Sequence, residues 1–487
     1  MHFIKIVVLI TCLISLNFIG FGQELEPSID KDDLRHIVQI LSADSLEGRG
    51  TATEGQKKAE RFIANSFSEL GLEPHYQNSF LEKFKLKKTY WGEVYIETSR
   101  GRLNNFEKIV LQGSNFQNVE VEKEIVFGGT GTDEELDQID VTDRLVLVFV
   151  NNLRAYYDIN KKLEKRNAFG LMLANPKNGS QFESVKRTLK NFTLAKRVTL
   201  LNKVTIDSIR PAGWDTIRFV NSFLIPNSQV KNISGLHIRK LKKLMRLNRI
   251  AEAPITTVET KFERINNVLE TANVIGIVKG KTKKTIVISA HYDHLGKIDN
   301  QFFPGADDNA SGVAGLLELA EQFSKSKNLK YNIMFLATSA EEAGLLGSYY
   351  HVNSSSFNPE NIILNLNLDM IARIDEKHSK GNYLYCIGSG QSKALDDLIE
   401  EADQAYNKCT FDYSLSDLKD PMGIFTRSDN YNFYKKGIPS YFFFSGLHSD
   451  YHKITDTSNK IDYQNLEYRV KQIAKVIELL QNENLKN

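Results

Sequence analysis

The sequence predicts an α/β fold in which helices flank a mostly parallel central sheet, with a β-rich domain inserted into the chain. From residue 273 onward, apolar runs of strand length alternate with helical segments. Strands separated by helices of this length pair in parallel and are covered on both faces. Between residues 93 and 260 the pattern changes to short β-type runs separated by polar, turn-rich segments. We therefore expect a discontinuous α/β domain and a separate insertion.

Each expected element follows from the spacing of its apolar residues. In the α/β domain we predict helices over 32–41 and 55–70, strands over 285–290, 332–338, 362–370 and 440–444, and helices over 313–323, 343–353, 392–406 and 463–481. In the insertion we predict strands over 93–97, 108–111, 124–127, 145–150, 171–173 and 217–223, and a basic amphipathic helix over 237–247. A solvated helix face is the preferred interpretation of that basic run.

The N-terminus is typical of a secretory signal peptide. One lysine precedes an apolar stretch over residues 6–21, and Gly20 and Gly22 provide small residues near a cleavage site. A lipid-modified Cys12 is the weaker alternative, because the residues before it match poorly. We expect the signal peptide over 1–22, the α/β domain over 24–92 and 261–487, and export to the periplasm or the exterior. No other stretch is long and apolar enough to span a membrane.

Composition narrows the possible partners. The chain has 487 residues and a formal charge of +2, which gives no case for a nucleic-acid partner. Only Cys386 and Cys409 remain after the expected cleavage, so the protein is not a disulfide scaffold. Two buried thiols are favoured over one bridge. The oligomeric state does not follow from the sequence.

Ionisable residues follow the predicted strands of the α/β domain, where the chemistry of open α/β sheets gathers. A single carboxylate or histidine at a strand end is more often a helix cap or a structural residue. Its repetition at strand after strand favours a metal site. These residues are His291, Asp293, Asp307, Asp308, Glu341, Glu342, Asp369 and His452.

The ligand types indicate which metal binds. Imidazoles and carboxylates without a thiolate suit zinc, cobalt or manganese rather than calcium. A single catalytic zinc takes three protein ligands, so five candidate ligands are too many. Five ligands with one shared carboxylate fit two metals about 3.5–4 Å apart. Glu341 and Glu342 are adjacent, so one can bind metal while the other acts as a general base.

Five motifs carry a resemblance to a known family. They are His291-x-Asp293, GADDNASG, SAEEAGLLGS, NLDM and YHKITDT. In this order and spacing, residues 273–480 resemble the co-catalytic di-zinc aminopeptidases, metallopeptidase family twenty-eight. The segment LEGRGTATEGQKKAERFI resembles the N-terminal helices of bacterial members, and the insertion is similar to a protease-associated (PA) domain.

The resemblance implies a role for each matching residue. His291 and Asp369 would bind the first metal, Glu342 and His452 the second, and Asp308 would bridge them. Glu341 would be the general base, and Asp293 would support the site from behind His291. The remaining residues would be neighbours of the ligands (His294, His448 and Asp307) or part of the substrate pocket (Arg427, Ser428, Asp429 and Tyr431).

The expected function is that of an exported zinc aminopeptidase, a metallo-exopeptidase that removes N-terminal residues from peptides. Two zinc ions are expected as cofactors, with cobalt or manganese as substitutes. A carboxypeptidase or dipeptidase on the same scaffold remains an alternative. A glutaminyl cyclase, which works with one zinc, and a non-catalytic peptide-binding protein are further alternatives.

Overall fold

The computed structural model describes residues 29–75, 78–112, 118–152, 155–193, 197–201, 220–298, 300–417 and 422–484. The predicted signal peptide lies outside the described residues. The chain forms two compact units: the first comprises Met1–Glu82, Asn273–Glu341 and His351–Asn487, and the second comprises Lys83–Ala272 and Glu342–Tyr350. The second unit thus takes in the residues that flank the predicted insertion on both sides.

The first unit is built on a mostly parallel sheet with the strand order β17-β16-β18-β15-β11-β14-β10. β11 pairs in parallel with β14 and with β15, β15 pairs in parallel with β18, and β16 pairs in parallel with β17. The antiparallel pairs are β10 with β14 and β16 with β18. The strands are β10 (Thr256–Val278), β11 (Thr285–His291), β14 (Asn332–Thr338), β15 (Ile362–Leu368), β16 (Tyr383–Ile387), β17 (Thr410–Asp412) and β18 (Ser440–Phe444).

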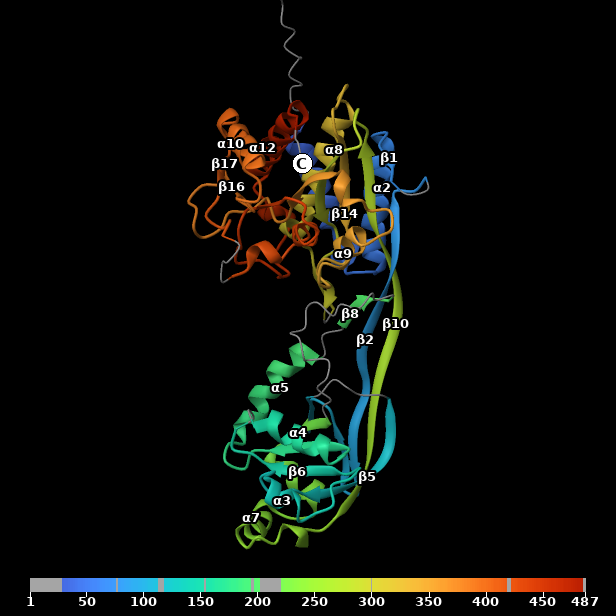
Figure 1. Ribbon diagram of the computed structural model, residues 1–487, viewed down its shortest axis with the longest axis vertical. Helices are drawn as coiled ribbons and strands as arrows, with labels where there is room; N and C mark the ends of the chain where they lie inside the picture. Colours follow the sequence, from blue (N-terminus) through green and yellow to red (C-terminus); the bar gives the residue numbers. More distant parts are fainter. Residues whose placement is uncertain are drawn as a thin grey trace, which may run out of the picture. The chain divides into compact units, whose positions relative to one another are not determined.

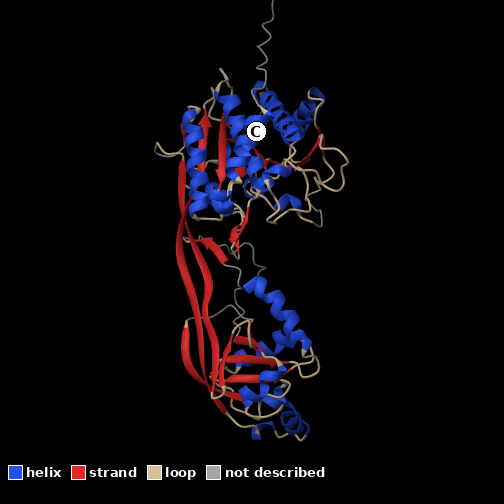
Figure 2. Ribbon diagram, turned by 180° about the vertical axis from the view of Figure 1, so that it is seen from behind, coloured by secondary structure: helices blue, strands red, loops and turns tan. Residues whose placement is uncertain are grey.

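Helices cover both faces of this sheet, as the continuous apolar strands require (Figure 2). Every residue of β11 is buried. Ile286 and Ile288 pack into a core with side chains of α1, α2, α8 and α12, whereas Val287 faces a second core that includes Phe433 of α11. Figure 1 shows α10 and α12 side by side. These helices are α1 (Lys31–Leu41), α2 (Glu54–Glu69), α8 (Gly312–Ser324), α10 (Lys393–Ala405), α11 (Asn430–Tyr434) and α12 (Tyr463–Asn482).

The predicted mostly parallel α/β fold is confirmed, and the main differences concern element ends and short strands. β14 and β18 have the predicted bounds, whereas α9 (Leu346–Val352) begins three residues later than expected, because Gly344 and Leu345 both have positive φ. The sequence pattern did not predict β16 or β17. Cys386, in β16, and Cys409 are both free and buried.

The second unit contains its own parallel strands and more helix than the β-rich prediction allowed. β5 (Val119–Phe127), β6 (Leu145–Phe149), β7 (Gly170–Ala174) and β9 (Asn221–Leu224) pair in parallel in that order. Parallel neighbours need crossover connections, which are usually helices. The helix α4 (Tyr156–Lys165) illustrates the missed signal, because Tyr156, Ile159 and Leu163 recur at helical spacing and are buried.

The remaining elements of the second unit surround these strands. β10 and β5 pair antiparallel, as do β4 and β9, and β2 pairs with β3 and β8. These elements are β2 (Leu81–Thr98), β3 (Gly101–Asn104), β4 (Val110–Leu111), β8 (Arg197–Leu200), α3 (Asp133–Leu136), α5 (Ser180–Thr193), α6 (Val230–Ser234) and α7 (Ile238–Arg246). α7 corresponds to the predicted basic helix.

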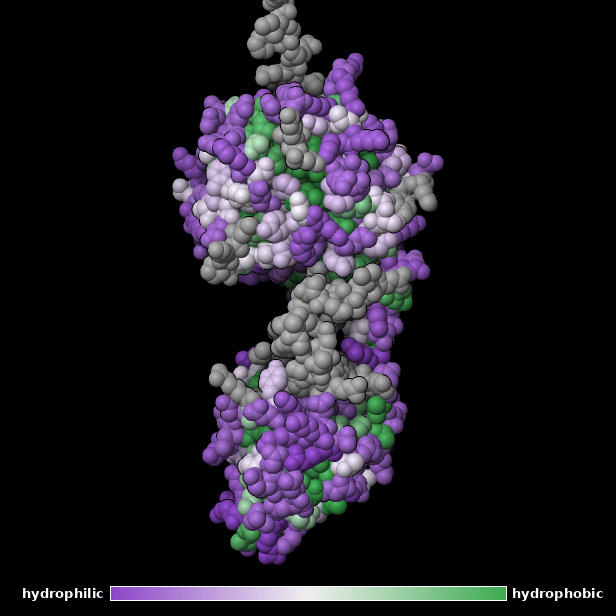
Figure 3. Space-filling view, in the orientation of Figure 1, coloured by the Kyte–Doolittle hydropathy of each residue, from purple (hydrophilic) through white to green (hydrophobic). Residues whose placement is uncertain are grey.

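The surface is mainly hydrophilic on the face drawn in Figure 3, and its apolar areas are small and scattered. Among the described residues, no helix combines the length and the apolar character that a membrane crossing requires.

Candidate metal centre

His291 is the last residue of β11, and its side chain is buried at the carboxyl end of the strand. Its Nδ1 lies 3.0 Å from the backbone carbonyl oxygen of Asp293, an atom that can only accept a hydrogen bond. Nδ1 therefore carries the proton, and the lone pair of Nε2 points the other way. Nε2 lies 3.2 Å from Oδ1 of Asp369 and 3.4 Å from Oδ1 of Asp308.

The close approach of these nitrogen and oxygen atoms indicates whether the residues fit a metal. A nitrogen lone pair and two carboxylate oxygens are all electron donors, so their mutual contact requires a cation or a proton between them. The ligand atoms of His291, Asp308 and Asp369 lie within 4.8 Å of one another, and all three side chains are buried. An imidazole and two carboxylates are also ligands that zinc accepts. The group therefore fits a metal ion.

The electrostatics of the cluster agree with this geometry. Burial lowers the pKa of His291, but the charges of Asp369 and Glu341 and the hydrogen bonds of Asp308 and Asp369 outweigh it, so this pKa stands well above its usual value. Burial raises the pKa of Asp308, but His294, His291 and His452 bring it well below the usual value. Both shifts indicate a carboxylate cluster that binds positive charge.

Asp308 presents its two oxygens to different imidazoles. Oδ1 faces His291, whereas Oδ2 lies 3.1 Å from Nε2 of His452 and 3.7 Å from Nδ1 of His294. This arrangement is the one a shared carboxylate needs. His294, which the sequence analysis treated as a neighbour, is buried beside Asp308.

The turn Ala306–Ser311 that carries Asp308 is tied to the end of β15. Asn309 Oδ1 accepts hydrogen bonds from the backbone N–H groups of Gly312 and Met370, at 2.9 and 3.1 Å, and its Nδ2 donates to the carbonyl of Leu368 at 2.9 Å. The peptide bond between Asp308 and Asn309 is cis. The backbone N–H of Asp308 donates to Asp456 at 3.1 Å. The Asp308 side chain is thereby held beside Asp369, which follows β15 directly.

Ser428 orients Asp369. Its hydroxyl donates to Asp369 Oδ2 at 2.7 Å, which leaves Oδ1 for the contact with His291. Ser428 also accepts a hydrogen bond from Nδ2 of Asn367, in β15, at 2.8 Å. Ser428 was expected in the substrate pocket, and its contact with Asp369 was not predicted, because nothing in the local pattern indicates that it lies beside β15.

The Asp293 side chain bonds to the backbone of Glu341 and also lies at ion-pair distance from His291. Its carboxylate is fully buried; Oδ1 accepts from the backbone N–H of Glu341 at 3.0 Å, and Oδ2 accepts from the hydroxyl of Thr51 at 2.7 Å. The distance from Asp293 Oδ1 to His291 Nδ1 is 4.0 Å. The backbone carbonyl of Asp293 orients His291, and its side chain fixes the start of the Glu341–Glu342 pair. Glu341 is half-buried.

The N-terminal loop LEGRGTATEG positions this edge of the sheet. The Arg49 side chain is fully buried and donates to the carbonyl oxygens of Tyr292, Pro304 and Gly305 at 3.0, 2.8 and 2.9 Å, and also to that of Leu41. It thereby joins the end of β11 to the turn that carries Asp308. Local sequence patterns do not indicate a buried arginine that bonds to distant carbonyl oxygens, so the roles of Arg49 and Thr51 were not predicted.

The remaining predicted residues have mixed surroundings. His452 is partly exposed, at 35%, and its ring stacks on Tyr451. Asp429 is fully buried and accepts a hydrogen bond from Thr338. Arg427 is exposed, and its Nη2 lies 3.4 Å from the hydroxyl of Tyr451.

Two further predicted residues are half-buried. Tyr431 lies beneath the ammonium group of Lys435, which is 4.7 Å from the ring centroid. Glu342 belongs to a group of side chains that could hold a metal ion.

Asp307 and His448 pair with each other, as expected for structural neighbours. His448 Nε2 lies 3.2 Å from Asp307 Oδ2. Asp307 Oδ1 accepts from the backbone N–H of Ala372 at 2.8 Å and from the hydroxyl of Ser311 at 3.0 Å. Asp307 therefore stabilises the turn, and its neighbour Asp308 faces the ligands.

The fold and the site together define the class: an α/β protein with a candidate metal centre at the carboxyl edge of its parallel sheet. Residues 273–477 match the model of Peptidase family M28. The family expected from the sequence motifs is thus confirmed. The similarity to a PA domain is not tested by this match, which begins after the insertion.

Curated relatives match parts of the chain. An aminopeptidase of Bacillus subtilis, YwaD, is 40% identical over 112 residues, which is 22% of this chain and 23% of that protein. A probable leucine aminopeptidase 2 of Aspergillus oryzae is 31% identical over 220 residues, 44% of this chain and 41% of that protein. The alignments therefore span less than half of the length of these relatives.

A solved structure extends the likeness in fold to almost the whole chain. The zinc aminopeptidase BSAP from Bacillus subtilis superposes with a TM-score of 0.52 at 20% sequence identity, covering 95% of this chain and 98% of that one. At this identity the likeness concerns the fold.

Proposed function

We propose that the protein is an exported zinc-dependent aminopeptidase that uses two metal ions and Glu341 as its general base. The observation that carries the proposal is the convergence of His291 Nε2 with the carboxylate oxygens of Asp308 and Asp369. The match of residues 273–477 to the model of Peptidase family M28 and the aminopeptidase relatives support the same activity.

The first ion would be held by His291, Asp308 and Asp369, and the second by Asp308, Glu342 and His452. The 3.1 Å approach of His452 to the second oxygen of Asp308 supports the sharing of this carboxylate. When bound, the ions would supply positive charge that lowers the pKa of water and offsets developing negative charge. Zinc is the preferred metal, with cobalt and manganese as substitutes, because the ligands are imidazoles and carboxylates.

Glu341 would take a proton from the attacking water and return it to the leaving amine. Its half-buried position leaves the carboxylate access to substrate, and the hydrogen bond from its backbone to Asp293 fixes where the side chain begins. Arg427 and Tyr431 are the candidate substrate contacts. Asp429 is the weakest of the three, because its buried carboxylate is bonded to Thr338.

Export through the N-terminal signal peptide and a PA-like role for the insertion belong to the proposal as well. A carboxypeptidase or dipeptidase on the same scaffold is the competing activity. Substrates with a blocked amino end and substrates with a blocked carboxyl end separate them: an aminopeptidase cleaves only the second kind.

The test is the zinc-loaded protein and its Glu341→Gln variant, assayed on a panel of aminoacyl chromogenic substrates. We expect chelator-sensitive activity in the wild type and a loss of about 100- to 10,000-fold in the variant, with its zinc retained. A wild type that cleaves no substrate with a free amino end would overturn the proposed function. A variant that keeps full activity, or that loses its zinc, would overturn the role of Glu341.

A further inference from the structure

A buried hydrogen-bond network lies next to the turn that carries Glu341, and the proposed mechanism does not use it. Glu82, Asn273 and His351 are 3%, 0% and 1% exposed. His351 Nδ1 lies 3.2 and 3.1 Å from the two carboxylate oxygens of Glu82, and Asn273 Nδ2 donates to Glu82 Oε2 at 2.8 Å. The other end of the same amide accepts the backbone N–H of Ser339 at 3.0 Å.

The charge on Glu82 sets the direction of the Asn273 amide. Burial raises the pKa of Glu82, but the charge and hydrogen bond of His351 and the hydrogen bond of Asn273 bring it below the usual value. An ionised carboxylate only accepts hydrogen bonds. Asn273 must therefore turn its NH₂ group toward Glu82 and its oxygen toward Ser339.

The turn after β14 needs such fixed partners. Ala340 has a φ of 59°, in the left-handed region that residues other than glycine occupy at an energetic cost. Ser339 is held on one side of it by Asn273 and by Gln56, whose Nε2 donates to the Ser339 hydroxyl at 2.7 Å. Glu341 is held on the other side by Asp293 at 3.0 Å.

The same carboxylate also reaches the far side of this turn. His351 lies in α9, the helix that follows the Glu341–Glu342 pair, and is bonded to Glu82. In addition, Glu82 and Asn273 are the residues between which Lys83–Ala272 is inserted. Glu82 thus connects the insertion point, the start of the turn and the helix after it.

We infer that Glu82 and Asn273 are positioning residues for Glu341: they hold the turn in the one conformation that aims the general base. This inference rests on the proposed function. Displacement of a catalytic group by about 1 Å can cost 100-fold in rate. Loss of the network should therefore lower kcat and leave KM unchanged, because Glu82 and Asn273 are not among the proposed substrate contacts.

The experiment exchanges the acid and the amide. Glu82→Gln lets the Asn273 amide reverse, and Asn273→Asp places a second carboxylate against Glu82. We expect each single variant to lower kcat about 10- to 100-fold on an aminoacyl chromogenic substrate. The double variant again pairs one acid with one amide, so it should recover most of the lost kcat.

Gln391→Ala is the matched control. Gln391 donates to the carbonyls of Gly388 and Ser440 at 2.6 and 2.7 Å and accepts from the Ser440 N–H at 3.0 Å, so its loss removes several largely buried hydrogen bonds at the start of β18. Its kcat should equal that of the wild type.

Three results would overturn the inference: single variants with wild-type kcat, a double variant without recovery, or an equal loss in Gln391→Ala. An inactive wild type in the same assay would instead reject the proposed function, and the inference with it.

Discussion

Both units of the molecule contain buried parallel strands, but their carboxyl ends differ in chemistry. In the first unit, β11 ends in His291, β15 is followed by Asp369, and β14 leads within three residues to Glu341. In the second unit, β5, β6, β7 and β9 are followed by Gly128, Val150, Asn175 and Ile225. The edge of a parallel sheet therefore provides a place for a site, and the side chains at that edge determine the chemistry of the site.

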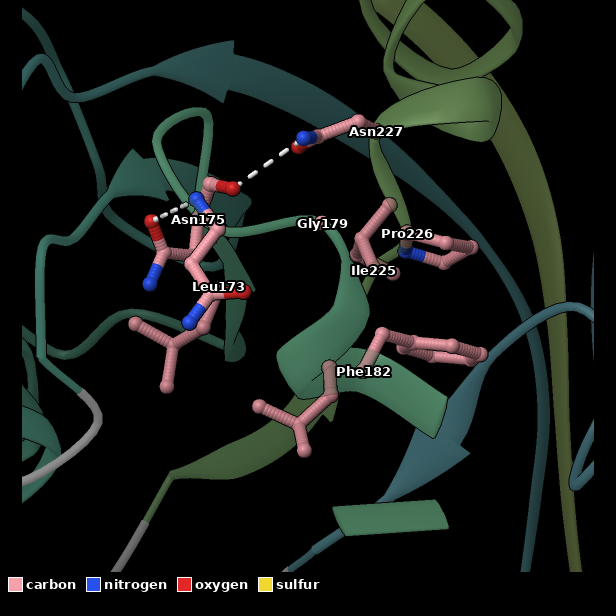
Figure 4. Close-up of a pocket in the computed structure, with 9 residues that line it drawn as sticks. Leu173, Asn175, Gly179, Phe182, Ile225, Pro226 and Asn227 are labelled. Atoms are coloured by element: carbon pink, nitrogen blue, oxygen red, sulfur yellow. Dashed lines mark hydrogen bonds between the residues drawn. The ribbon is translucent and has the colours of Figure 1, made fainter. Parts of the chain in front are cut away.

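Several polar groups at the second edge form hydrogen bonds with one another. Asn175 and its neighbours line a small pocket beyond β7 and β9 (Figure 4). Asn175 Oδ1 accepts from the backbone N–H groups of Lys177 and Asn178 at 3.1 and 3.0 Å, and Asn227 donates to the carbonyl of Asn175 at 3.1 Å. These contacts close a loop, whereas the carboxylates around His291 require a cation.

Metal removal should have the largest effect on activity. A chelator should abolish aminopeptidase activity completely, because both proposed ions contribute to catalysis. It should also lower the melting temperature by several degrees, since loss of a ligand that binds only the folded state removes stability. Activity assays and thermal unfolding with and without chelator measure both effects, and re-added zinc is the control. Unchanged activity in the chelated protein contradicts the expectation.

Replacement of the shared carboxylate should have the next largest effect. Asp308→Asn keeps the shape of the side chain but removes the charge that faces His291 and His452. We expect a loss of activity of about a thousandfold and a clear loss of bound zinc. Asp307→Asn is the matched control, because Asp307 pairs with His448 and the turn backbone. A greater loss of zinc in Asp307→Asn would reverse the assignment of the two aspartates.

Replacement of one buried polar residue in each unit should lower the stability of both variants but abolish activity only in the first unit's variant. Arg49→Ala leaves buried carbonyl oxygens unsatisfied at the candidate metal centre, so it should cost about 3 kcal/mol or more and abolish activity. Asn160→Ala in the second unit removes bonds to Val220 and Ser222 and should cost about 2 kcal/mol. Activity of the still-folded Asn160→Ala protein should be normal; denaturant unfolding and kcat measure both.

Glu318 should have the smallest effect on activity, because it changes only the pH dependence of stability. Burial raises its pKa to about 7, with smaller contributions from Asp33, Glu321 and Asp30. Between pH 4.5 and 7 the folded state holds a proton that the unfolded state has released, so stability falls as pH rises through this window. Glu318→Gln should remove up to about 3 kcal/mol of this decline. Unfolding curves of both proteins at pH 5 and pH 8 measure this decline in the free energy of unfolding. An equal decline in the wild type and in Glu318→Gln would contradict the expectation.

The sequence predicted the elements and residues whose signals are local. The β-branched run of β11 and the motifs that contain His291, Asp308, Asp369 and Glu341 carry such local signals. α4 was missed although its periodicity is helical, because the β-type runs around it dominated the interpretation. β16 and β17 were missed because each is short.

The contacts of the supporting residues could not be predicted for a different reason. Arg49, Asn273 and Ser428 act through contacts with residues distant in the sequence, such as Tyr292, Ser339 and Asp369. Each is an ordinary polar residue in its own segment. Only the folded chain brings each of them into contact with a candidate ligand or with the surroundings of the proposed general base.

The central claim is that the ionisable edge of the first unit is a two-metal centre. The most direct test is the zinc content per chain of the full-length protein and of Asp308→Asn, measured by elemental analysis after removal of loosely bound metal. We expect about two zinc ions per chain in the wild type and fewer than one in the variant. A wild type that binds no zinc, or a variant that retains two ions, would contradict it.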